Sequence, residues 1–115
     1  MNRGEVRWYA FGPPDRRRPV LILTRDAVIH RLNEIIVAPV TRTIRGLTTE
    51  VLLSPDDGMP IVCALNLDHV SLAQRNRIGA PLCTLPESRW PEVRRRFLSR
   101  AALKVRKLRI RLPHP

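Results

Sequence analysis

The chain is poor in aromatic residues and has no long apolar run. Aromatic side chains make up 4% of the 115 residues, whereas hydrophobic residues make up 43%. A core of this composition must consist mainly of Val, Ile and Leu. The longest apolar runs span four or five residues, far below the ~20 that a membrane-spanning helix needs. The length, close to the usual ~100–150 residues of a domain, predicts a single domain.

Cysteine is scarce, and the N-terminus lacks the apolar segment of a signal peptide. Cys63 and Cys83 are the two cysteines, too few for a disulfide-stabilised scaffold and not spaced as metal ligands. We interpret them as buried thiols of a protein in the reducing cytoplasm. Arg3, Glu5 and Arg7 place charge in the first seven residues, which argues against a secretory leader.

Several well-known catalytic motifs are absent. The sequence contains no GxxxxGK[ST], HExxH, GxSxG or GxGxxG pattern, so it gives no sign of phosphate-loop, zinc-protease, serine-hydrolase or dinucleotide chemistry. His30, His69 and His114 are not spaced as metal ligands. We therefore expect no metal and no cofactor. An enzyme of this sequence would work with Arg, Thr, Asp or His side chains.

Positive charge, in contrast, is abundant and concentrated near the C-terminus. The formal net charge is +11 at pH 7. Residues 89–115 hold ten basic side chains and one acidic one, whereas residues 1–88 are nearly balanced. Such a block favours a polyanionic partner, most simply a nucleic acid, through counterion release. The alternative is a solvated helix face followed by a basic tail, so the charge alone does not decide.

Short apolar segments separated by Gly and Pro turns predict a β-rich body. The expected strands are residues 5–11, 18–24, 34–41, 49–53, 60–72 and 77–83. The polar segment between the second and third of these suits one helical turn. Short strands at regular intervals are typical of a small barrel or a strongly bent antiparallel sheet. The expected fold class is therefore mainly β (α+β), with one helix packed on the sheet.

That helix is predicted after Pro86, because Pro and Glu suit a first helical turn. Its apolar residues recur every three or four positions and form a stripe that should pack on the sheet: Trp90, Val93, Phe97, Leu98, Ala101 and Val105. The arginines of the helix should remain in solvent. Residues 106–115 follow as a basic C-terminal extension.

Two predicted strands each carry a polar side chain at one end. Arg18 begins the strand 18–24, and Thr41 ends the strand 34–41. Pro19 holds Arg18 in an extended backbone. If the two strands pair, the guanidinium and the hydroxyl lie close together at the sheet rim, where they suit a phosphate. The alternative is that Arg18 forms a structural salt bridge and Thr41 merely closes a strand end.

Several segments, in order and spacing, resemble the MazF/PemK-like toxins, the mRNA interferases of bacterial type II toxin–antitoxin pairs. The similar segments are residues 3–8, 18–23, 38–41 and 45–51, supported by 66–70 and 77–85. The resemblance makes residues 1–105 a single toxin domain and leaves 106–115 as an extension. It implies an SH3-like small barrel, a homodimer, a cognate antitoxin, and cleavage of single-stranded RNA that arrests growth.

This resemblance and the chemistry of RNA assign roles to Arg18 and Thr41. The 2′-hydroxyl of RNA attacks the adjacent phosphodiester and yields a 2′,3′-cyclic phosphate and a 5′-hydroxyl, with no metal required. Arg18 would stabilise the charge on the phosphate oxygens. Thr41 would hydrogen-bond a phosphate oxygen or orient the 2′-hydroxyl. The general base stays open between Asp68 and His69.

The expected RNA-binding residues flank this pair, because unpaired bases stack on aromatic side chains and arginines bind phosphates. They are Phe11, Arg16, Arg17, Arg42, Thr43, Asp68 and His69. We assign Trp8 and Tyr9 to the core or a dimer interface, and Arg45 first to a turn. Two alternatives remain: a gyrase-directed toxin of the same fold, and a non-catalytic, SH3-like nucleic-acid-binding module.

Overall fold

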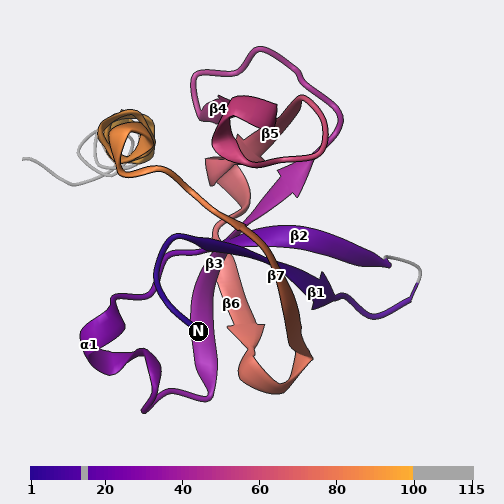
Figure 1. Cartoon of the computed structure of the whole chain (residues 1–115), viewed down its shortest axis with the longest axis vertical. Helices are drawn as coiled ribbons and strands as arrows, with labels where there is room; N and C mark the ends of the chain where they lie inside the picture. The colour runs from indigo at the N-terminus through magenta and orange to yellow at the C-terminus, as the bar shows by residue number, and fades with distance from the viewer. Residues whose placement is uncertain (14–15, 100–115) are drawn as a thin grey trace, which may run out of the picture.

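The computed structural model describes residues 1–13 and 16–99, and its seven strands form one strongly bent sheet (Figure 1). The strands are β1 (Glu5–Ala10), β2 (Arg17–Ile22), β3 (Glu34–Thr41), β4 (Glu50–Leu53), β5 (Cys63–Asn66), β6 (Ser71–Gln74) and β7 (Ile78–Thr84). Their order is β4-β5-β3-β2-β1-β7, with β6 also paired to β3, and the pairs are antiparallel. No pairing between described residues joins β4 to β7, so the sheet remains open.

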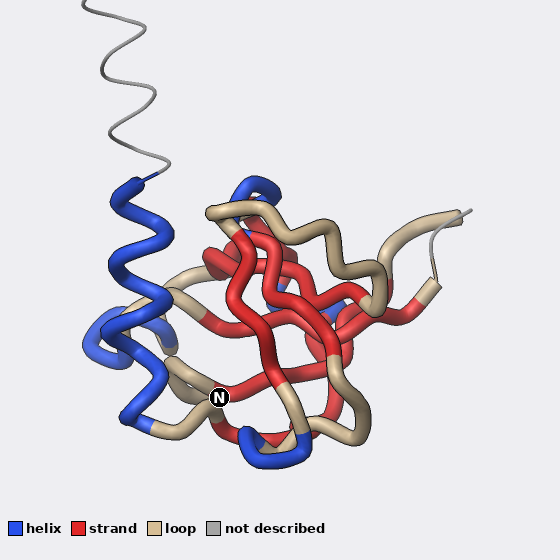
Figure 2. The backbone as a smooth tube through the Cα atoms, turned by 90° about the horizontal axis from the view of Figure 1, so that it is seen from above, coloured by secondary structure: helices blue, strands red, loops and turns tan. Residues whose placement is uncertain are grey.

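The helical elements before the C-terminus are short. They are α1 (Asp26–Ile29) and four 3₁₀ turns: η1 (Pro55–Asp57), η2 (Leu67–His69), η3 (Arg75–Arg77) and η4 (Glu87–Arg89). Residues 90–99, which follow η4, are helical. Figure 2 shows this C-terminal helix beside the sheet. Among the residues described, no helix has both the length and the apolar character needed to cross a membrane.

The predicted fold class, mainly β with a C-terminal helix, is confirmed, and the strand 34–41 has its predicted bounds. The prediction of one strand over residues 60–72 is wrong, because η2 divides it into β5 and β6. At the break, the Asn66 side chain accepts the N–H of Asp68 at 3.0 Å. Such a local side-chain bond favours a turn over continued extension.

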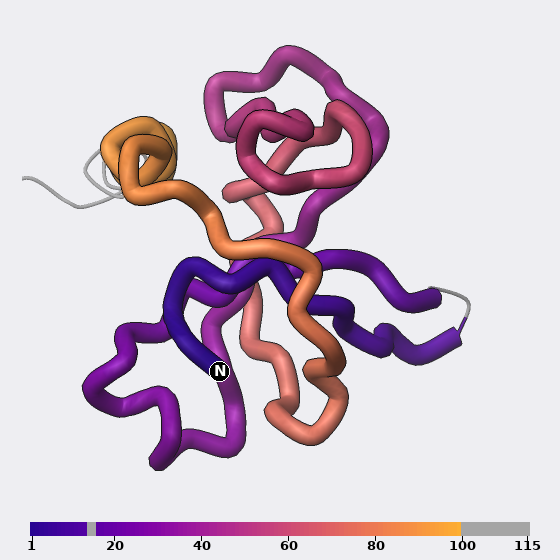
Figure 3. The backbone as a smooth tube through the Cα atoms, viewed as in Figure 1, coloured from indigo at the N-terminus to yellow at the C-terminus, as the bar shows by residue number. Residues whose placement is uncertain are grey.

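β3 joins the two halves of the molecule. On one edge it pairs with β2; on the other it pairs first with β6, through Val37, and then with β5 from Val40 onward. Figure 3 shows β3 running from the half that holds α1 and β6 into the half that holds β4 and β5. Its change of partner bends the sheet.

Two apolar clusters cover the two faces of the sheet. Val20 and Ile22 of β2 belong to one cluster, and Leu21 between them belongs to the other. Alternate side chains of a strand point to opposite faces, so β2 is covered on both sides. Since burying one such side chain contributes about 1.5–3 kcal/mol, these clusters hold β2 firmly against its neighbours.

The C-terminal helix packs through only part of its predicted apolar stripe. Val93 is 3% exposed, and Trp90 packs against the same cluster. Phe97 and Leu98, in contrast, are 37% and 57% exposed, so the predicted packing is wrong for these two. Within residues 90–99, the apolar contact with the core is therefore made by Trp90 and Val93. The remaining stripe residues and the proposed extension lie outside the described residues: Ala101, Val105 and 106–115.

We predict that Gly58→Ala destabilises the fold strongly. Gly58 follows η1 with φ of +95°, and a β carbon there would lie 2.9 Å from Cβ of Cys83. Left-handed strain and overlap together should lower the free energy of unfolding by about 2–5 kcal/mol in a urea titration. Gly46 has φ of +71° but open space around it, so Gly46→Ala should cost only about 1–2 kcal/mol. Equal losses at the two positions would contradict the steric argument.

Candidate functional site

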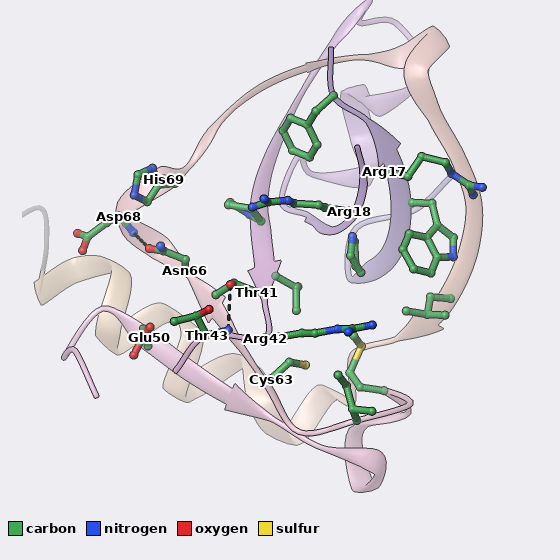
Figure 4. Close-up of a pocket in the computed structure, with 18 of the residues that line it drawn as sticks. Arg17, Arg18, Thr41, Arg42, Thr43, Glu50, Cys63, Asn66, Asp68 and His69 are labelled. Atoms are coloured by element: carbon green, nitrogen blue, oxygen red, sulfur yellow. Dashed lines mark hydrogen bonds between the residues drawn. The ribbon is translucent and has the colours of Figure 1, made fainter. Parts of the chain in front are cut away.

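A cleft of about 1130 Å³ opens where β2 and β3 separate. The pairing of these strands that the structure describes ends at Val20 and Pro39, while on its other edge β3 pairs with β5 from Val40 onward. The same antiparallel register, continued by two residues, places Arg18 opposite Thr41. Both residues line the cleft (Figure 4). The loss of strand pairing therefore leaves room between the guanidinium and the hydroxyl.

Thr41 is oriented by the backbone that follows it. Its Oγ1 accepts a hydrogen bond from the N–H of Thr43 at 3.1 Å. A hydroxyl that accepts one bond keeps its own hydrogen for donation to another group. Figure 4 shows Arg18 extending over Thr41. The two side chains thus face a common space in which a phosphate would meet a cation and a hydroxyl donor.

Most of the predicted RNA-binding residues line the same cleft. These residues are Phe11, Arg17, Arg42, Thr43, Asp68 and His69. Arg16, in contrast, is exposed and is not among the lining residues. Tyr9 is a core residue, 7% exposed, whose ring supports Phe11 in an edge contact at 4.7 Å between centroids.

The two candidate proton acceptors differ in their surroundings. Oδ2 of Asp68 accepts a hydrogen bond from the Thr49 hydroxyl at 2.7 Å, and Figure 4 shows the Asp68 carboxylate turned away from Thr41. His69, the next residue, is exposed and also lines the cleft. Both residues are exposed and line the cleft, so the choice of base between them stays a prediction.

Sequence reasoning missed several lining residues. Trp8, assigned there to the core or a dimer interface, is half-buried and lines the cleft. Arg45, assigned first to a turn, also lines it. Glu50, to which the sequence analysis assigns no role, lines the cleft as well. The pairing of β1 with β2 would have pointed to Trp8, because Trp8 lies opposite Pro19, next to Arg18.

Glu50 holds the loop that joins β3 to β4. Its side chain is buried, at 4% exposure, and its Oε1 accepts the N–H groups of Arg45 and Leu47 at 3.1 and 3.0 Å. The Glu50 N–H donates in turn to the Leu47 carbonyl at 3.1 Å. Hydrogen bonds of this kind compensate the burial of a carboxylate. They also fix the backbone that presents Arg42 and Thr43 to the cleft.

The C-terminal helix supports the same loop from outside. Nη1 of Arg96 donates to the Thr48 carbonyl at 3.0 Å, and its Nε donates to Glu92 at 2.9 Å. Arg89 in η4 donates to the Leu52 carbonyl at 2.7 Å. The prediction that the helix arginines remain in solvent is therefore wrong for Arg96, because the loop offers it a carbonyl acceptor.

Positive charge dominates the cleft. The cationic lining residues are Arg17, Arg18, Arg42 and Arg45.

The thiol of Cys63, which also lines the cleft, is unreactive. Burial, and then the neighbouring Cys83 and Asp57, raise the pKa of the Cys63 thiol. Cys63 therefore stays protonated near neutral pH and is a poor nucleophile. Both cysteines are free, with Cys63 buried as predicted and Cys83 only partly so. In the part of the chain that the structure describes, no three His, Cys, Asp or Glu side chains gather as metal ligands would.

Comparison with known proteins gives consistent similarities. Residues 2–99 match the family of the PemK-like, MazF-like toxin of type II toxin-antitoxin system. The probable endoribonuclease MazF5 of Mycobacterium tuberculosis is 52% identical over 69 residues, which cover 59% of this chain and 62% of that protein. This chain thus spans less than two thirds of MazF5. The probable endoribonuclease MazF2 of the same species is 37% identical over 93 residues, 80% of this chain and 89% of that protein.

A solved structure agrees with these similarities. The MazE-MazF crystal structure (Form-III) from Deinococcus radiodurans has a chain that is 27% identical, with a TM-score of 0.76. The superposition covers 89% of this chain and 96% of that chain. The bent sheet with its C-terminal helix is therefore a fold already seen among solved toxin structures.

We predict that Glu50→Ala loosens the loop between β3 and β4, because it leaves the Arg45 and Leu47 amides without their acceptor. The free energy of unfolding in urea should fall by about 1–3 kcal/mol, and the Leu47 amide should exchange with solvent faster. Glu50→Gln keeps an acceptor oxygen and should cost less. The matched control is Glu34→Ala at an exposed strand position, expected within about 0.5 kcal/mol. An unchanged exchange rate of the Leu47 amide in Glu50→Ala would contradict the role of Glu50 in holding this loop.

Proposed function

The chain belongs to the PemK-like, MazF-like toxins of type II toxin–antitoxin systems, and on this basis we propose that it is an endoribonuclease that cleaves single-stranded mRNA. The observation that carries this proposal is the placement of Arg18 and Thr41 in one cationic cleft. The relatives MazF5 and MazF2 are themselves named probable endoribonucleases.

The reaction needs no nucleophile from the protein, because RNA supplies its own. The 2′-oxygen attacks the adjacent phosphorus and loses its proton, and the bond from phosphorus to the 5′-oxygen breaks. The leaving oxygen takes up a proton, so the products are a 2′,3′-cyclic phosphate and a 5′-hydroxyl. The protein has to hold the line of attack and stabilise the extra charge on the phosphate oxygens.

Arg18 and Thr41 suit these two tasks. The guanidinium of Arg18 stays charged and presents a planar fork to two phosphate oxygens. The Thr41 hydroxyl, which already accepts the Thr43 N–H, donates to a phosphate oxygen. Of the two proton acceptors, His69 is the better base for the 2′-hydroxyl, since Asp68 is engaged by Thr49.

The remaining cleft residues bind the strand on either side of the scissile linkage. Arg42 and Arg45 neutralise neighbouring phosphates, and Thr43 adds a hydroxyl. Phe11 offers a ring to an unpaired base. A duplex would keep its bases stacked away from these groups, so the substrate is single-stranded.

A homodimer and a cognate antitoxin complete the proposal. Two copies of this small domain would offer RNA a longer track than one cleft does. A chain of similar fold was solved as part of a MazE-MazF complex, which supports an antitoxin partner for this protein. An acidic, disordered antitoxin segment would be attracted to the arginine-lined cleft and would compete with RNA there. The site of action is the cytoplasm, where the mRNA is.

We predict that Arg18→Ala and Thr41→Ala each slow the cutting of a long unstructured RNA by about 100-fold or more. The assay contains EDTA, maps the 5′ ends of the products and tests their 3′ ends for a cyclic phosphate. Arg18→Lys should be intermediate, because it keeps the charge but loses the fork. Thr41→Ser should retain most of the activity.

Arg16→Ala is the matched control for Arg18→Ala, since Arg16 is an exposed arginine that does not line the cleft. It should cut RNA at the normal rate. Full activity in both Arg18→Ala and Thr41→Ala would remove the site assignment. Absence of any cutting, with inhibition of gyrase supercoiling, would favour the gyrase-directed alternative. RNA binding without a cyclic-phosphate product would favour the non-catalytic module.

A further inference from the structure

Part of the cleft lining consists of apolar and planar groups rather than of phosphate ligands. These lining residues include Trp8, Met59, Pro60, Ile61 and Leu82. Met59 Sδ lies 3.5 Å from Cys83 Sγ, so the segment after η1 meets β7 beside β1. Figure 4 shows Arg17, which stacks on Trp8, on the opposite side of the cleft from Asp68 and His69.

Arg17 and Trp8 form a stacked pair because of the strand register. Trp8 lies opposite Pro19, and Ala10 lies opposite Arg17, so Trp8 and Arg17 are diagonal neighbours on one face of the β1–β2 ribbon. The guanidinium carbon of Arg17 is 5.3 Å from the centroid of the Trp8 ring. Cation and ring at this distance attract each other.

Arg18, the next residue along β2, points to the other side of the strand, because side chains alternate. One short stretch of β2 thus presents a cation to the reacting phosphate and a cation on an indole ring to the neighbouring part of the substrate.

We propose that Trp8 and Arg17 form a subsite for one unpaired nucleobase adjacent to the scissile linkage, an inference that rests on the proposed RNA cleavage. A phosphate would use Arg17 alone, whereas a base has an apolar face that stacks on both a Trp ring and a guanidinium plane. Ile61, which is 43% exposed, and Leu82 supply apolar contacts at the margin of the same space. Because Arg17 already holds the indole, little ordering is needed when the base binds.

The chain contains a chemically matched control for this pair. Arg3 stacks on Trp90 with 5.6 Å between its guanidinium carbon and the ring centroid. Trp90 precedes Val93 in the C-terminal helix, and neither Arg3 nor Trp90 is among the residues that line the cleft. A substitution of Trp90 therefore changes an equivalent pair without touching the proposed subsite.

The first test measures the binding of a short RNA made uncleavable by 2′-deoxy substitution at the cut site, by fluorescence anisotropy. Trp8→Ala should raise the dissociation constant by ~5- to 150-fold, the usual range for the loss of one base stacked on an aromatic ring. Trp8→Phe, which keeps a ring, should lose less, and Trp90→Phe should bind like the wild type. Wild-type affinity in a folded Trp8→Ala protein would overturn the subsite.

The second test locates the base by replacing each nucleotide of this RNA in turn with an abasic residue. In the wild type, one position next to the cut site should lose affinity by a similar factor. In Trp8→Ala that position should lose its effect while the others keep theirs. The same abasic profile in both proteins would contradict the proposal. If Trp8→Ala does not fold, Arg17→Ala at an exposed position replaces it, with the same expectation and the same contrary result.

Two further readouts distinguish a nucleobase subsite from a subunit contact and from a protein that is no nuclease. A change of mass by light scattering in Trp8→Ala, with an unchanged abasic profile, would assign Trp8 to a subunit contact and overturn the subsite. Wild-type protein that cuts no RNA would defeat the proposed function itself. Wild-type protein that cuts RNA but shows no Trp8-dependent position would defeat the subsite alone.

Discussion

The change of partner along β3 is the constraint on which this structure depends. On one edge, the partner of β3 changes from β6 to β5 at Val40; on the other edge, the pairing of β3 with β2 ends at Pro39. The sheet bends at this point, and β2 and β3 part. Residues beyond that point keep the register of the strands without their hydrogen bonds. The cleft occupies the space so formed, and the last residue of β3 and the start of β2 project into it. Site and bend thus have one cause.

The cleft is held open by groups that do not take part in the chemistry. Glu50 is buried and accepts the amides of the loop after β3, while Arg96 holds a carbonyl of the same loop from the C-terminal helix. Since buried charges are costly unless they are hydrogen-bonded, each of these contacts favours a single loop conformation. The arginines of the loop can then bind phosphate without first being ordered, which is the main benefit of preorganised sites.

Local patterns in the sequence predict much of this fold, because strands and turns here follow short-range preferences. The apolar run of β3 and the alternation in β2 are of this kind. The pairing of Arg18 with Thr41 follows from assuming that two such strands are neighbours. Local patterns do not contain long-range contacts. Trp8 reaches the cleft through its register with β2, and the role of Glu50 depends on a loop that closes around it. Phe97 shows the opposite case: it belongs to a regular apolar stripe, yet it remains 37% exposed.

The central claim is that one guanidinium and one hydroxyl act on the same phosphate, and a double-mutant cycle tests it most directly. Single-turnover cleavage rates of one RNA would be compared for the wild type, Arg18→Ala, Thr41→Ala and the double variant. Residues that act as a unit give non-additive losses, so the double variant should be far less impaired than the product of the two single losses. Losses that multiply fully, as they do for independent sites, would contradict the account.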